Sequence, residues 1–450
     1  MYHAIFPSKD ATIYNCTIDG TNLSSSNAGA SEILELIHLT SSIATRGNSR
    51  ILMAFDLTSV SSSISSGEIS ASTVQYKLFI KNAVHAETVP YGFHVEVAPL
   101  SRSFLEGRGL SNFDEGLKDK NLPCNWRQAD QTNNWSQAGG DYFSSSNLTA
   151  SQYFETGHED LDIDVSNIVG NWLTGGLANY GFIVKFSSSY EDSTSDFYVK
   201  KFFSRNAHAP ERLPKLNIFW EDVLQDDRKN ISYGGITGSI FYYRFINGAY
   251  NNLSPVYVQL YNSSSTVAQT LTASRHSNGI LFVSGVNLSV TSSTQIYRDV
   301  WFSSTTQYFT GNITPQYNTG SSFYDYDNLV VNLPNLKVFR PDEKTIIRVF
   351  IRERDYRPAI ASRATSEPTP IFVKNGYYQI LNAETEEVLV DFSTGSLKYS
   401  KLSYDENGNY FKFWSSALKP EYIYKIKILT DFNNQSFVFD NSFRFKIERA

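Results

Sequence analysis

A chain of 450 residues is too long for a single hydrophobic core, so roughly two to four domains are expected. With a formal net charge of -6 and scattered basic residues, it cannot neutralise a run of nucleic-acid phosphates, which argues against a nucleic-acid partner. Its 41% hydrophobic and 14% aromatic residues are enough to build packed cores and exclude a disordered chain.

The sequence contains no run of about 18 apolar residues, and its first residues lack a basic segment followed by an apolar one. We therefore expect a soluble protein, with no membrane partner and no Sec-dependent export from this end. Cys16 and Cys124 fit no CxxC spacing and are too few for a disulfide scaffold, so both are expected to be reduced and structural.

Most of the chain alternates apolar and polar residues between clusters of Ser, Asn and Gly, which is the pattern of strands and turns. In chain order, the clearest predicted strands are 49–57, 74–83, 93–100, 239–246, 256–262 and 422–429. Their branched and aromatic residues suit a half-buried pleated surface. The sequence therefore predicts an all-β protein.

Three aspartates alternate with apolar residues in a predicted strand at 160–165. Asp160, Asp162 and Asp164 share one face, and the apolar residues between them face the core. We favour a solvated polar face. The sharper alternative is a Ca²⁺ site, although no glycine-punctuated DxDxDG loop accompanies the acids. Catalysis is least favoured, because an exposed row of acids offers no means of separating their pKa values.

A short helix is predicted directly after this strand. Ser166 can cap its start, and the glycine pair at 175–176 can end it. The residues expected on its buried face, at spacings of three and four, are Ile168, Val169, Trp172 and Leu173.

Two breaks in composition divide the chain: the charged stretch 221–230 and the segment 333–344, which carries two prolines. The predicted domains are 1–222, 223–333 and 334–450, and each has a size that suits a β-sandwich. We therefore expect three β-sandwich domains in series, with the short helix at one end of the first.

The loop 124–143 is rich in aromatic rings, amides and glycines. A sugar needs ring faces for stacking and amides for its hydroxyls, so Trp126, Trp135 and Tyr142 are candidate carbohydrate-binding residues. The favoured alternative is that these rings pin a long loop onto the sandwich. The arginine-rich segment 348–358 is expected to be an exposed edge strand or a contact to a neighbouring subunit.

Other motifs give little support to enzymatic chemistry. The seven histidines include no HExxH, and no GxSxG, P-loop or GxGxxG stands between a strand and a helix. No pair of acids is singled out as a glycosidase would need, so that activity is least favoured. We predict a protein that is not an enzyme, with no catalytic residues, cofactor or metal.

Several phrases of the first 222 residues together resemble a known family. They are KDATIY (9–14), SRILMAFDL (49–57), VQYKLFI (74–80), VEVAPLSRSFLEG (95–107), NW (125–126), the segment 160–186 and KKFFSRNAHAPERLPKLNIFW (200–220). They resemble the DNRLRE, or disaggregatase-related, β-sandwich domain. The resemblance implies a jelly roll with the helix packed across one end. It also implies a binding or assembly module of the kind found in cell-surface proteins and tailed phages.

Two phrases near the end, YYQILNAETEEVLVDFS (377–393) and KLSYDENGNYFKFWSSALKPEYIYKIKI (401–428), resemble the C-terminal sandwich of virion proteins from large marine myophages. Residues 223–333 resemble nothing specific. The two smaller domains are expected to be Ig-like sandwiches.

Together these resemblances imply a virion structural protein of a tailed phage, assembled in the host cytoplasm. We expect it in the tail, neck or baseplate region rather than on the capsid surface. Its partners would be other virion proteins, with a homo-oligomer in a symmetric ring or at a fibre attachment. The alternative is an adhesin that binds a host surface glycan through the first domain.

Overall fold

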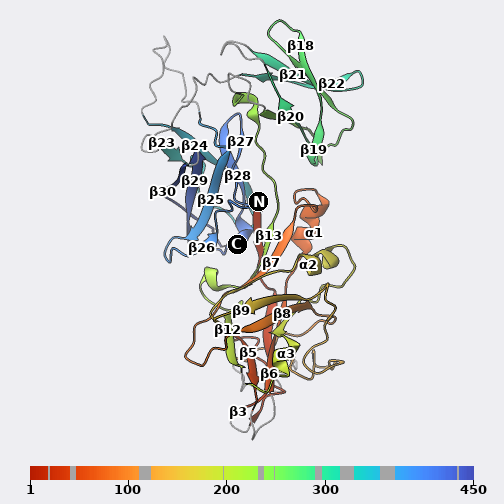
Figure 1. Cartoon of the computed structure of the whole chain (residues 1–450), viewed down its shortest axis with the longest axis vertical. Helices are drawn as coiled ribbons and strands as arrows, with labels where there is room; N and C mark the ends of the chain where they lie inside the picture. Colours follow the sequence, from red (N-terminus) through yellow and green to blue (C-terminus); the bar gives the residue numbers. More distant parts are fainter. Residues whose placement is uncertain are drawn as a thin grey trace.

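The computed structural model describes residues 1–18, 21–40, 47–110, 123–195, 197–231, 238–247, 249–288, 296–314, 329–354, 370–432 and 435–449. These residues form three antiparallel β-sandwiches, which confirms the predicted all-β fold with three sandwiches in series. Figure 1 shows the first sandwich at the bottom, the second at the upper right and the third at the upper left.

The first sandwich has a four-stranded and a seven-stranded sheet. The smaller sheet has the order β1 (Tyr2–Ile5), β13 (Lys215–Phe219), β7 (Gln75–Ile80), β10 (Leu161–Asp164). The larger sheet has the order β12 (Phe197–Phe203), β5 (Ile33–Leu39), β6 (Gly47–Ala54), β11 (Phe182–Phe186), β8 (Phe93–Pro99), β9 (Ala150–Phe154), and β2 (Lys9–Asn15) also pairs with β6. A hairpin of β3 (Thr17–Ile18) and β4 (Thr21–Asn22) accompanies them.

Both faces of the larger sheet are buried. Ile51 and Met53 of β6 point into the core between the sheets, whereas Leu52 and Ala54 point outward into a second cluster. Because successive strand residues alternate faces, this double burial requires apolar residues at consecutive positions, as the run ILMAF provides. The outer cluster is closed by the tryptophan-bearing loop.

The helices are short. The predicted helix is confirmed as α2 (Ser166–Leu173), which buries Ile168, Val169 and Trp172. The predicted cap is wrong: Val165 stands at the N-cap position, and the Ser166 hydroxyl instead accepts from the Tyr76 N–H at 2.9 Å. Two further helices were not predicted: α1 (Thr58–Ser65), where Asp56 before the N-cap residue Leu57 accepts from the Thr58 N–H at 2.9 Å, and α3 (Ser188–Glu191). Single 3-10 turns occur at η2 (Pro210–Arg212), η3 (Asp227–Lys229) and η5 (Ser415–Ala417). Within the described ranges, no helix is both long and apolar enough to cross a bilayer.

The second sandwich packs around the fully buried Trp301. One sheet has the order β14 (Gly238–Tyr243), β20 (Ile280–Val286), β19 (Ser274–Ser277), and the other β18 (Val267–Thr272), β17 (Tyr257–Tyr261), β21 (Tyr297–Ser303), β22 (Thr306–Ile313). A small hairpin of β15 (Phe245–Ile246) and β16 (Ala249–Tyr250) extends from the first sheet.

The third sandwich also has two sheets. Their orders are β23 (Leu329–Asn332), β24 (Lys344–Glu353), β28 (Gly408–Trp414), β27 (Ser403–Asp405), and β26 (Val388–Val390), β25 (Asn375–Asn382), β29 (Ile423–Phe432), β30 (Gln435–Lys446). The predicted boundary near 334 assigns β23 to the second domain, but β23 pairs with β24. The expected edge strand is also wrong: β24 lies between β23 and β28, and residues 355–358 of that segment lie outside the described residues.

The first and third sandwiches share their interiors. Tyr2, Ala4 and Phe219, on the outer face of the smaller sheet of the first sandwich, belong to the core cluster of the third. In return, Trp414 of β28 packs into the core cluster of the first sandwich, beside Trp220. The two domains are therefore one packed body, although the second domain separates them in the chain.

The segment 221–231 runs along the third sandwich before it enters the second. Gln225 pairs in parallel with Tyr404, and the Tyr404 hydroxyl donates to Asp227 at 2.7 Å. The second sandwich rests on this segment through a small cluster of Leu224, Phe241 and Ile280. It reaches the first sandwich through the Asn278 amide, which donates to the carbonyl of Ser66 at the end of α1 at 2.9 Å.

Candidate functional site

The candidate site is a pocket of about 450 Å³ where the three sandwiches meet. Three of its walls come from different domains: Glu68 from the turn after α1, Tyr250 from β16, and Trp414 from β28. A second pocket of about 470 Å³ lies next to it and shares Glu68 and Asn278. The second domain therefore lies beside two hollows, each lined in part by residues of the first domain.

Oppositely charged side chains from different domains pair in the first pocket. Lys344 Nζ lies 2.6 Å from Glu68 Oε2, and it also lies 4.2 Å from the ring centre of Trp414. Lys412 pairs with Asp222 of the connecting segment. Because each lysine meets a carboxylate from outside its own domain, the pocket carries little net charge and its ion pairs connect the domains.

An aromatic group forms the floor of this junction. Trp414 lies between Trp220, at a ring separation of 5.4 Å, and His3, at 5.0 Å. Burial, together with the charge of Lys344, lowers the pKa of His3 to about 4, so this imidazole is neutral at neutral pH. The Nδ1 atom of His3 is buried and has no hydrogen-bond partner among the described residues. A neutral, partly unsatisfied histidine at a domain junction makes that junction sensitive to acid.

The predicted carbohydrate-binding rings lie elsewhere, on the outer face of the larger sheet of the first sandwich. Trp126 is only 7% exposed and Trp135 only 5%, and the indole N–H of Trp135 donates to the carbonyl of Asn125 at 2.8 Å. Arg50 covers Trp126 and Tyr142 at 5.0 and 5.7 Å from the ring centres. The ring faces that a sugar would need are therefore occupied, as the loop-anchor interpretation expects.

Asp162 and Asp164 lie on β10 and Asp160 directly precedes it, and each of the three has a protein partner. Asp162 pairs with Lys77 at 3.1 Å and Asp160 with Lys81 at 3.2 Å, while Asp164 accepts from the Ser166 N–H at 2.8 Å. Among the described residues, no group of three or more His, Cys, Asp or Glu side chains is placed to hold a metal ion. The arrangement fits the solvated face rather than the Ca²⁺ site.

Both cysteines are buried and free. Burial raises the pKa of the Cys16 and Cys124 thiols to about 12 in each case, so both stay protonated and weakly reactive.

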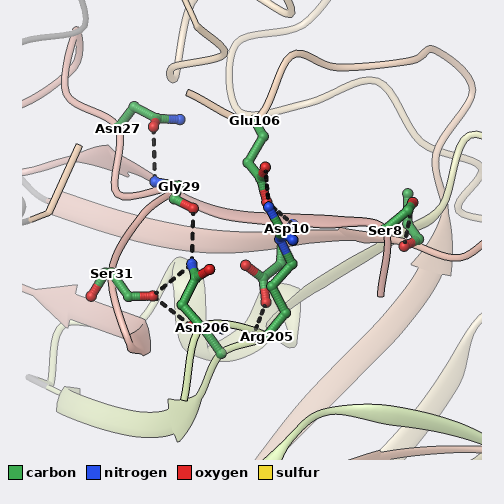
Figure 2. Close-up of polar contacts among 10 residues, drawn as sticks. Ser8, Asp10, Asn27, Gly29, Ser31, Glu106, Arg205 and Asn206 are labelled. Atoms are coloured by element: carbon green, nitrogen blue, oxygen red, sulfur yellow. Dashed lines mark hydrogen bonds and ion pairs between the residues drawn. The ribbon is translucent and has the colours of Figure 1, made fainter. Parts of the chain in front are cut away.

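A buried acid cluster in the first sandwich was missed by the sequence analysis. Figure 2 shows Asp10 of β2 beside Glu106 and Arg205. Arg205 holds Glu106 through two hydrogen bonds of 2.6 and 2.7 Å, and its backbone N–H donates to Asp10 at 2.8 Å. Burial raises the pKa of Asp10 to about 7, against the opposing effect of the Arg205 N–H. No local signal could have revealed it, because the partners are about 100 residues apart.

The residues of the three-domain pocket were missed for the same reason. Glu68, Asp222, Lys344 and Lys412 come from four separate segments, and none stands in a recognisable motif. Only the tertiary arrangement brings them together.

No family model and no curated protein matches the chain. Among solved structures, it is similar to the N-terminal Ig1-2 module of the Drosophila receptor protein tyrosine phosphatase DLAR, with 9% identity and a TM-score of 0.18 over 50% of this chain and 95% of that one. It is similar to elastase-activated alpha-2-macroglobulin of Escherichia coli with 11% identity and a TM-score of 0.18 over 49% and 19%. The BSP domain of biofilm associated protein aligns with 10% identity and a TM-score of 0.17 over 96% and 68%. At TM-scores this low, these similarities carry no functional argument.

Proposed function

We propose that the protein is a structural component of a tailed-phage virion, which works by binding neighbouring subunits in the tail, neck or baseplate region. The phage assignment rests on the resemblance of the first and third domains to modules of such virions. The role as a rigid connector rests on the shared interior of these two domains.

The merged core is the observation that carries the proposal. A subunit that transmits force between neighbours needs domains that do not move apart when each is held by a different partner. Exchange of Trp414 and Phe219 between two cores provides this, because separating the domains would expose apolar surface that is costly to hydrate. Adhesion to a glycan has no comparable support, since Trp126 and Trp135 are buried.

The deciding experiment is mass spectrometry of purified virions, with the abundance of this chain measured against the major capsid protein. Tail, neck or baseplate placement predicts a small copy number that is a multiple of three or six, as symmetric rings around the tail axis require. Hundreds of copies would indicate capsid decoration instead. Complete absence from washed particles would contradict the proposal.

A glycan array with the full chain separates the alternative. Saturable binding to a host surface glycan would favour the adhesin, whereas no binding, together with presence in particles, supports assembly.

A further inference from the structure

Lys200 of β12 is fully buried in the first sandwich. Its Nζ lies between the rings of Phe154, at 5.0 Å, and Phe202, at 4.8 Å. Three oxygen atoms surround the amine: Asn82 Oδ1 at 2.5 Å, the Gly157 carbonyl at 2.7 Å and the Glu159 carbonyl at 2.9 Å.

The carboxamide of Asn82 is brought to this amine from the opposite sheet. Asn82 follows β7 of the smaller sheet, whereas Lys200 lies on β12 at the edge of the larger one. The backbone of Asn82 is held in place, because its N–H donates to Asp160 Oδ1 at 2.7 Å and it forms a bridge with Phe202. Two positions 118 residues apart are therefore fixed with an amine against an amide.

This environment differs from those of the other buried lysines in the described part of the chain. Lys185 meets the carboxylate of Glu96 at 2.8 Å and Lys425 meets that of Asp440 at 2.9 Å. Lys215 donates to the Leu389 carbonyl at 3.4 Å and lies 5.2 Å from the ring centre of Phe79. A carboxylate partner keeps a lysine charged. A carboxamide partner offers an electrophilic carbon instead.

Three acceptors match the three protons of an ammonium, so a purely structural ion is the simpler interpretation. Burial opposes it, since desolvation lowers the pKa of Lys200 to about 8, although Glu159 and Asp160 raise it. Roughly a tenth of the molecules then hold a neutral amine at pH 7. An irreversible reaction needs no larger fraction, because every molecule passes through that state.

The side chain of Glu159 adds a charge to the surroundings of this amine. Burial acts to raise the pKa of Glu159, but N–H groups around Thr156 outweigh it and bring the pKa to about 2, so the group is ionised. Its Oε2 atom is buried and has no hydrogen-bond partner among the described residues. The charge of Glu159 acts on Lys200 and raises its pKa, so an ionised carboxylate lies in the neighbourhood of the amine.

We propose that Lys200 and Asn82 join in an intramolecular amide cross-link between the two sheets of the first sandwich. The neutral Nζ attacks Cγ of Asn82, the Cγ–Nδ2 bond breaks, and one proton passes from Nζ to Nδ2, so that ammonia leaves. No oxidant, metal or other reactant is consumed.

The test is intact mass spectrometry of the full chain, purified and denatured, followed by peptide mapping. The expected result is a mass lower than that of the sequence by one molecule of ammonia, together with a branched peptide that joins residues 82 and 200. An unmodified mass overturns the proposal. A deficit confined to a succinimide at an Asn–Gly pair, such as Asn278–Gly279, also overturns it, because that product joins no two peptides.

Variants add a second measurement. Asn82→Ala and Lys200→Met should each restore the mass of their own sequence, whereas Lys185→Met, which removes a buried lysine that faces a carboxylate, should retain the full deficit. Persistence of the branched species in Asn82→Ala would refute the assignment. The wild-type mass decides the matter even if a core variant fails to fold.

Discussion

The junction between the first and third sandwiches differs in kind from the junction that holds the second. The first and third exchange large apolar side chains, so each core is completed by the other. The second sandwich contacts its neighbours through the small apolar cluster around Leu224 and through the hydrogen bond from the Asn278 amide to the Ser66 carbonyl. The connecting segment adds a surface ion pair between Lys229 and Glu406. The second sandwich is therefore held loosely by the domains next to it in sequence, whereas the first and third, which are far apart in sequence, pack as one body. The contrast predicts one large cooperative unit and one separable unit.

Replacement of Trp414 should have the largest effect on stability. Trp414→Ala is expected to destabilise the protein by about 3 to 5 kcal/mol, the usual cost of emptying a buried aromatic site. Because Trp414 belongs to a strand of the third sandwich but packs in the core of the first, the two sandwiches should lose stability together in a calorimetric or urea transition. Trp301→Ala is the matched control and should affect only the second sandwich. A Trp414→Ala variant in which the third sandwich alone melts early would break the comparison.

Acid should weaken the same junction through His3. Its pKa is about 4 in the folded protein and near 6.5 when unfolded, so the unfolded chain gains a proton first as the pH falls. Stability is thus lost between about pH 6.5 and pH 4, by up to about 3 kcal/mol. His3→Gln should remove this loss in urea titrations at a series of pH values. An unchanged pH profile would show that His3 does not limit the junction.

Asp10, which lies inside the first sandwich and away from both junctions, should make stability depend on pH in the opposite direction. Because the pKa of Asp10 is raised in the folded protein, its protonated form contributes to the free energy of unfolding. This contribution is complete below about pH 4 and is lost as the pH rises to about 7. Asp10→Asn, which keeps the neutral shape, should be more stable than the natural chain at pH 8 by roughly 2 kcal/mol. Equal stability at pH 8 would mean that burial does not raise the pKa of Asp10. His3 and Asp10 change the stability in opposite directions over the same range of pH. The stability of the unmodified protein should therefore vary less with pH than that of either variant.

The junction that holds the second sandwich should be weakened by the loss of a single hydrogen bond. Asn278→Ala removes the hydrogen bond to Ser66 and should cost only about 1 kcal/mol, without shifting the transition of the first sandwich. The expected result is a greater radius of gyration by small-angle scattering, as the second domain moves away. Gln307→Ala, which loses a hydrogen bond to Thr310 within that domain, is the control. No change in scattering would show that other contacts hold the domain.

The smallest effect is expected for the ion pair between Lys344 and Glu68. Both side chains are largely exposed, so Lys344→Met should cost about 0.5 kcal/mol in dilute salt, and the difference should vanish near 1 M NaCl, where charges are screened within about 3 Å. Lys337→Met, which loses a pair within the third sandwich, should change stability equally without altering the domain arrangement. A cost that persists in high salt would point to the contact with Trp414 instead.

Alternation and composition were enough to predict the all-β fold, the clearest strands and the helix at Ser166–Leu173, because these features depend on residues close in sequence. The boundary near 334 separates β23 from its pairing partner β24, because that pairing joins segments that the composition break divides. The serine-rich helix α1 was missed, since TSVSSSIS has little intrinsic helical preference. The strand β24 carries charges typical of an edge, but β23 and β28 pair with it on both sides. The shared core, the ion pairs of the pocket and the Asp10 cluster were not predicted. Each is formed by segments far apart in sequence, so no local sequence pattern indicates it.

The second sandwich also closes on itself at its base. The backbone N–H of Thr314, after its last strand, donates to the carbonyl of Arg228, before its first, at 3.2 Å. Entry and exit therefore lie side by side, as in a unit spliced into a host fold. Evolution could lengthen, exchange or reshape this part while leaving the combined body beneath it intact, so variation among related proteins should concentrate there.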